Sequence, residues 1–173
     1  MRVGAMRNSR ILALSGVLVA LGGITASPSL AVTTVTTTFN VTATVLNNCA
    51  VSASDLAFGN YSASSGSAVT ATTTLSVTCT ASLGYTIALD GGTTTGLVAA
   101  RAMKDAGSNQ LGYGLYTSGA YSTVWGDGTG STQTVPGTGS GSAQSVTVYG
   151  RIPAAQYVAA GSYADRVTVT VTY

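Results

Sequence analysis

The chain lacks histidine and glutamate altogether, and only 7% of its residues are charged. Without histidine it has neither the commonest ligand of a catalytic metal nor the usual base at neutral pH. Its only acidic side chains are Asp55, Asp90, Asp105, Asp127 and Asp165. Seven basic residues and a formal charge of +2 are too few for nucleic-acid binding, which needs clustered Lys and Arg. The composition therefore predicts no enzyme, no cofactor, no metal and no nucleic-acid partner, and it favours a structural or interaction protein.

The N-terminus has the layout of a secretory signal peptide, which we assign to residues 1–31. Three arginines precede an uncharged apolar run, residues 11–24. This run is shorter than the ~20 apolar residues of a spanning helix, and small residues follow it. We expect cleavage after Ala31; cleavage after Ala26 and a short membrane anchor are the alternatives. The mature chain is then an exported protein of one domain with four basic and five acidic residues.

Cys49 and Cys79 are the only two cysteines of this chain. Exported proteins mature in an oxidising compartment, and neither a histidine nor a second cysteine pair is present to complete a metal site. We therefore predict a structural disulfide that joins two strands. It closes a loop of about 30 residues, for which the chain-entropy estimate is ~3–4 kcal/mol.

Alternation of apolar and polar residues runs through the rest of the sequence. In the last segment Val167, Val169, Val171 and Tyr173 share one face, and threonines occupy the other. Similar runs cover residues 41–51, 69–80, 85–89, 111–116, 121–125 and 145–152, with Gly, Asn, Ser and Pro turns between them. Residues 126–141 read as one long exposed loop. Many short strands with frequent turns predict an antiparallel β-sandwich.

Both ends of the mature chain look like strands without an obvious neighbour. The final strand runs to the last residue with one charge, Arg166, near its start, although a long apolar edge is normally protected. Residues 32–39 form a second extended, threonine-rich stretch. The two ends can pair within one molecule and close the sandwich, or they can pair head to tail between copies and build a fibre. The pattern alone leaves both possibilities open.

Several stretches, taken in their order along the chain, resemble the spore coat U family, which includes the archaic chaperone–usher pilins. They are Phe39–Cys49, Asp55-Leu-Ala-Phe-Gly-Asn-Tyr61, Leu75–Cys79, Leu111–Tyr116, Trp125–Gly128, Val148–Pro153 and Gly161-Ser-Tyr-Ala-Asp165. Each stretch is weak by itself, but the set spans nearly the whole mature chain in order.

The resemblance implies an incomplete immunoglobulin-like antiparallel β-sandwich that is completed by a donor strand. A periplasmic chaperone would fill the gap during export, and an outer-membrane usher would exchange it for the N-terminal extension of the next subunit. The resemblance thus implies a pilin that polymerises into surface pili for adhesion and biofilm formation. The expected domains are the extension, residues 32–41, and the pilin domain, residues 42–173.

Under this interpretation, particular apolar residues would form the contact between subunits. The donor strand would present Val35, Phe39 and Val41. The acceptor groove would be lined by Val167, Val169, Val171 and Tyr173.

The alternative function is a secreted monomeric glycan-binding or coat protein with a closed sandwich. Arg101, Lys104 and Asp105 are expected to form a solvated loop.

Overall fold

The computed structural model describes residues 31–173, so the predicted signal peptide lies almost entirely outside the described residues. The chain divides into two units at Thr42. In the first unit, the described residues 31–42 carry no helix or strand, and all of their side chains are exposed. The second unit is a domain of residues 43–173. Across residues 31–173 no helix is both long and apolar enough to span a membrane.

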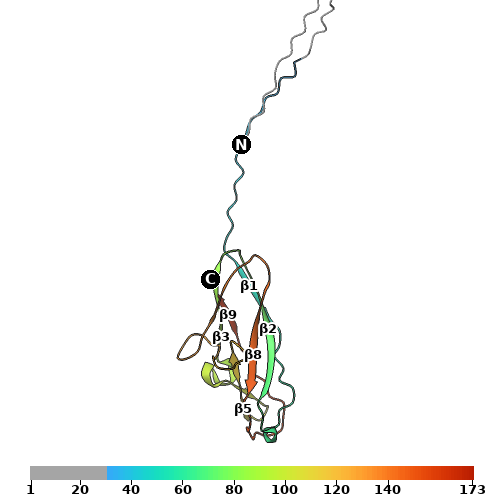
Figure 1. Ribbon diagram of the computed structural model, residues 1–173, viewed down its shortest axis with the longest axis vertical. Helices are drawn as coiled ribbons and strands as arrows, with labels where there is room; N and C mark the ends of the chain where they lie inside the picture. The colour runs from blue at the N-terminus through green and yellow to red at the C-terminus, as the bar shows by residue number, and fades with distance from the viewer. Residues whose placement is uncertain (1–30) are drawn as a thin grey trace, which may run out of the picture. The chain divides into compact units, whose positions relative to one another are not determined.

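The domain of residues 43–173 consists of antiparallel strands in two main sheets (Figure 1). The first sheet has the order β1-β2-β8-β6 and contains β1 (Cys49–Ala53), β2 (Val69–Cys79), β6 (Gly114–Tyr116) and β8 (Gln144–Ile152). The second sheet has the order β7-β3-β9 and contains β3 (Gly84–Leu89), β7 (Val135–Thr138) and β9 (Val169–Thr172). A small ribbon and three helical turns complete it: β4 (Ala102–Lys104), β5 (Gln110–Gly112), α1 (Gly92–Thr95), η1 (Ala63–Ser65) and η2 (Val98–Ala100).

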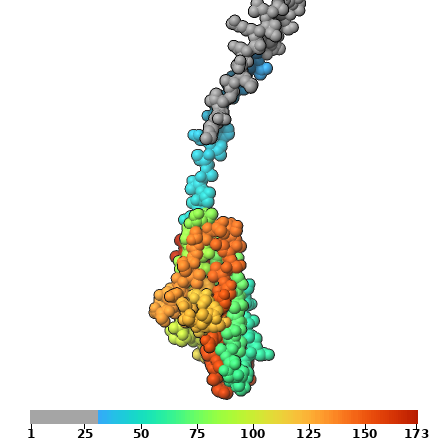
Figure 2. All heavy atoms as spheres, in the orientation of Figure 1, coloured from blue at the N-terminus to red at the C-terminus, as the bar shows by residue number. Residues whose placement is uncertain are grey.

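The core lies between the two sheets because alternate residues of each long strand face inward. In β2 and β3 the buried positions are Leu75, Val77, Cys79, Tyr85, Ile87 and Leu89. Trp125 is fully buried among them, and its indole N–H donates to the carbonyl of Ile87 at 3.0 Å. Figure 2 shows β2 (green) and β8 (orange) side by side on one face of the domain. The predicted fold class, an open antiparallel sandwich, is confirmed.

Several predicted strands have different bounds in the structure. The run predicted over residues 41–51 becomes a strand only at Cys49, because only from there does β2 lie opposite it. Residues 121–125 contribute only isolated bridges. The loop predicted over residues 126–141 contains β7, which pairs with β3. Strand propensity does not reveal which segments find a partner.

The predicted disulfide is confirmed, and the predicted solvated loop is wrong, because Lys104 is an exposed residue of β4 and Arg101 is buried. Cys49 and Cys79 are bonded and lie directly opposite each other in β1 and β2. Arg101 is only 2% exposed. Its guanidinium donates to the carbonyls of Leu89, Asp90 and Trp125 at 2.8–3.1 Å, which joins the end of β3 to the loop after β6. Its third guanidinium nitrogen, Nη1, is buried without a hydrogen-bond partner. A buried cation bound by carbonyls far apart in sequence leaves no periodic signal.

Candidate functional site

The two main sheets have four edge strands, β1, β6, β7 and β9, and two of them, β1 and β9, border the candidate site. Within the described part of the chain, β1 pairs only with β2, and β9 pairs only with β3. The main chain of Thr168 bonds to Asp90, with its carbonyl accepting at 3.1 Å and its N–H donating at 2.9 Å. Antiparallel pairing alternates, so the main-chain groups of Val167 and Val169 face away from β3. They can therefore pair with an added strand.

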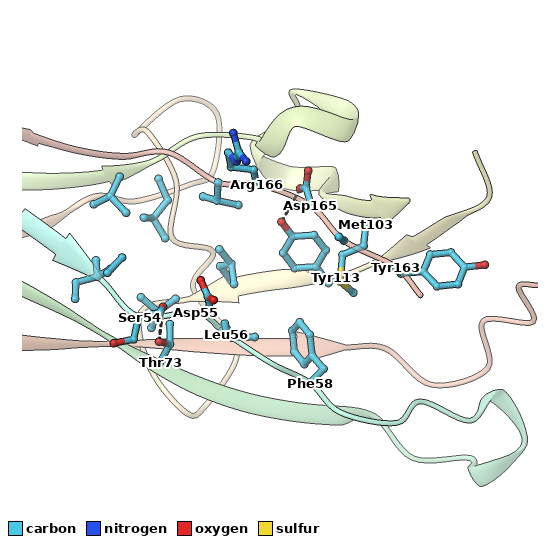
Figure 3. A pocket seen from close by; sticks show the side chains of 18 residues that line it. Ser54, Asp55, Leu56, Phe58, Thr73, Met103, Tyr113, Tyr163, Asp165 and Arg166 are labelled. Carbon is cyan, nitrogen blue, oxygen red and sulfur yellow. Dashed lines mark hydrogen bonds between the residues drawn. The ribbon is translucent and has the colours of Figure 1, made fainter. Parts of the chain in front are cut away.

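A groove of about 520 Å³ lies beside these edges (Figure 3). Its apolar lining comes from both sheets and from the loops before β9: Leu56, Phe58, Leu75, Leu89, Met103, Leu115, Val148, Val167 and Val169. A second hollow of about 870 Å³ shares Leu56, Phe58, Met103 and Tyr163 with the first. The two hollows therefore adjoin each other.

The walls of the groove are segments that have almost no regular pairing. Residues 54–62 on one wall carry no helix or strand. On the other wall, residues 154–168 make only an isolated bridge, at Ala164 to Lys104. The residues of both segments are exposed or half-buried, so their main-chain groups are open to water or to an added strand.

The floor of the groove depends on a glycine in β8. Gly150 is buried, and a Cβ atom at this position would lie 2.8 Å from side-chain carbons of both Leu56 and Phe58. The absent side chain lets these two residues pack onto the first sheet from the segment after β1. Phe58 also meets the ring of Tyr113 edge to face, with 6.2 Å between centroids. Figure 3 shows Phe58 and Tyr113 close together in the groove.

Asp165 places its own carboxylate in the lining of the groove. Its two oxygens accept hydrogen bonds from the hydroxyls of Thr93, Thr94 and Tyr113 and from the N–H of Thr94, at 2.8–3.1 Å. Burial opposes the ionisation of Asp165, but the bonds from Tyr113 and Thr94 outweigh it, so its pKa lies below the ordinary value. Burial, followed by the bond to Asp165, raises the pKa of Tyr113, which remains a donor. The network fastens one groove wall to α1 and to the floor.

The Asp165 network predicts a pH dependence of stability. Because its folded pKa is depressed, its stabilising effect is complete above the unfolded pKa, about 4, and is lost as pH falls through the lower folded value. An Asp165→Asn variant should therefore unfold at lower urea concentration than the parent near pH 7, and the difference should shrink near pH 3. Urea unfolding at both pH values measures it. A difference that does not change with pH would contradict the ionic role.

The structure places the predicted contact residues in different surroundings. Val167 and Val169 are half-buried and line the groove. Val171 also packs against the core but lies outside the groove lining. Tyr173 follows β9 and is 56% exposed. The predicted donor residues Val35, Phe39 and Val41 are 91%, 85% and 84% exposed.

Sequence reasoning missed the residues that form the floor and the polar centre of the groove. Leu56, Phe58 and Asp165 lie in stretches whose sequence indicates only the family resemblance. Residues 31–173 contain no cluster of three His, Cys, Asp or Glu side chains of the kind that holds a metal ion.

Comparison with known proteins relates the chain to a protein family and to solved structures. The model of the Spore Coat Protein U domain matches residues 35–170. A chain from the crystal structure of the CsuC–CsuE chaperone–tip adhesion subunit pre-assembly complex, from archaic chaperone–usher Csu pili of Acinetobacter baumannii, is similar in fold, with a TM-score of 0.57 and 23% identity. The similarity covers 75% of this chain and 40% of that one. A search of curated protein sequences found no significant match.

Proposed function

Because the chain belongs to the Spore Coat Protein U domain family, we propose that it is a structural subunit of a surface pilus built by the chaperone–usher route. Each domain would receive the N-terminal extension of the next copy as its missing strand. The head-to-tail contact is open-ended, so it makes a fibre rather than a closed oligomer. This is a structural role without catalysis.

The observation that carries the proposal is the complementarity of two features of the chain. The domain has a groove with many apolar residues in its lining, beside two strand edges that lack a neighbour. The extension is an unpaired segment whose Val35, Phe39 and Val41 are exposed to solvent. Burying three or four such side chains is worth roughly 5–10 kcal/mol before ordering costs. A ladder along the open edges would add register to this contact.

The same groove gives a reason for a chaperone and an usher. A subunit without a donor strand exposes an apolar cleft and free strand edges, which are aggregation hazards during export. A periplasmic chaperone that lends a strand would cover both, and an outer-membrane usher would replace this strand with the extension of another subunit. The subunit would thus pass through the periplasm to the cell surface. There the fibres would serve adhesion and biofilm formation.

The proposal predicts that replacing residues 32–41 with a Gly/Ser segment of equal length abolishes polymers. The variant keeps the acceptor groove and the chain length but loses the apolar plugs, so it should accumulate as a folded subunit with its disulfide closed. Detached surface material on unheated denaturing gels measures polymer length. A second variant that exchanges only Thr36 and Thr38 for serine is the control and should assemble normally. Parent-like fibres from the Gly/Ser variant would refute strand donation by this segment.

A further inference from the structure

The first residues of the domain are held by Thr80 at Leu46 and Asn48. The hydroxyl oxygen of Thr80, which follows β2, lies 3.4 Å from the carbonyl oxygen of Leu46 and 3.3 Å from that of Asn48. The N–H of Asn48 donates back to this hydroxyl at 3.0 Å, and the N–H of Thr80 donates to the carbonyl of Asn48 at 2.9 Å. These bonds fix residues 46–48 against the start of the domain. The disulfide fixes the next residue, Cys49.

One apolar face of the extension continues as far as this anchored point. Successive side chains of an extended chain point to opposite faces, so the odd-numbered residues share a face. Val35, Phe39, Val41 and Val45 all lie on it, and they are 82–91% exposed. Leu46, 76% exposed, lies on the opposite face. Val45 is thus the last apolar residue of the odd face before the anchored residues begin.

The residues of the opposite face support the same extent. Between Val35 and Val45 the even-numbered positions are Thr36, Thr38, Asn40, Thr42 and Thr44, and all of them are polar. The difference between an apolar odd face and a polar even face therefore lasts as far as Val45.

We propose that the donor face extends through Val45, so that the last plug is followed at once by residues bound to the donating domain. The partner is a second copy of this chain, and the inference rests on the proposed function. Consecutive domains are then joined without a flexible linker. The orientation of each subunit is therefore set by the groove of its predecessor.

Three aspartate variants of the full chain test this extension. Phe39→Asp and Val45→Asp place a charge on the donor face, whereas Leu46→Asp is a neighbouring change of equal chemistry on the opposite face. All three positions are exposed in the subunit, so folding should be unaffected. Polymer ladders of detached surface material, together with the yield of oxidised subunit, give the readout. We expect loss of long polymers from the first two variants and a parent-like ladder from Leu46→Asp.

The outcomes separate this inference from the function on which it rests. A normal ladder from Phe39→Asp would overturn strand donation itself. If Phe39→Asp loses its polymers and Val45→Asp gives a normal ladder, only the inference that the donor face extends through Val45 is overturned. Equal loss of polymers from Val45→Asp and Leu46→Asp would overturn the same inference. A milder variant, Val45→Ala, removes two methyl groups from the contact. Its polymers should dissociate about tenfold faster in guanidinium than the parent, and an unchanged rate would count against the inference.

Discussion

Val169→Asp is expected to abolish polymerisation. Val169 is half-buried, lines the groove and packs against the core, and its main-chain groups face the open edge of β9. An aspartate there would be desolvated under an incoming strand without a partner of opposite charge. This desolvation costs several kcal/mol, comparable with the whole apolar gain from the donor. Surface polymer measured by detachment and unheated gels should fall below detection.

Thr170→Asp provides the matched control for the groove variant. Thr170 is the next residue of β9, and its side chain is exposed on the other face. The same charge there should leave polymer yield close to that of the parent. Circular dichroism and the fraction of oxidised subunit show whether Val169→Asp still folds. If it does not fold, polymer yield is measured instead on Val169→Thr, in which the side chain has nearly the same volume. Parent-like polymers from Val169→Asp would show that β9 takes no part in the contact between subunits.

The double variant Cys49→Ser, Cys79→Ser is expected to lose about 3–4 kcal/mol of unfolding free energy. The bond closes a loop of 30 residues, so its removal raises the conformational entropy of the unfolded chain. It also holds the start of β1, a strand of five residues with one neighbour, against β2. Guanidinium unfolding followed by the fluorescence of Trp125, which is fully buried, measures the change. A loss below about 1 kcal/mol would contradict the predicted role of the disulfide.

Sequence patterns sufficed wherever a property depends on neighbouring residues in the chain. Side chains in β2 and β8 alternate between faces because strand geometry requires it, so their extents were predicted closely. The disulfide followed from two cysteines in a chain with a predicted export signal. The alternation of Val167, Val169 and Val171 likewise gave the buried face of the last strand.

Which strands have neighbours was decided only by the tertiary structure. The residues before Cys49 are richer in Val and Thr than those of β1, yet only β1 faces a partner, because pairing joins residues far apart in sequence. The groove floor required Gly150 to lie under Leu56 and Phe58, more than ninety residues away in the chain. Asp165 acquired its role from Thr94 and Tyr113 by the same kind of convergence. Local pattern determined the faces of the strands, and long-range packing determined where a strand is missing.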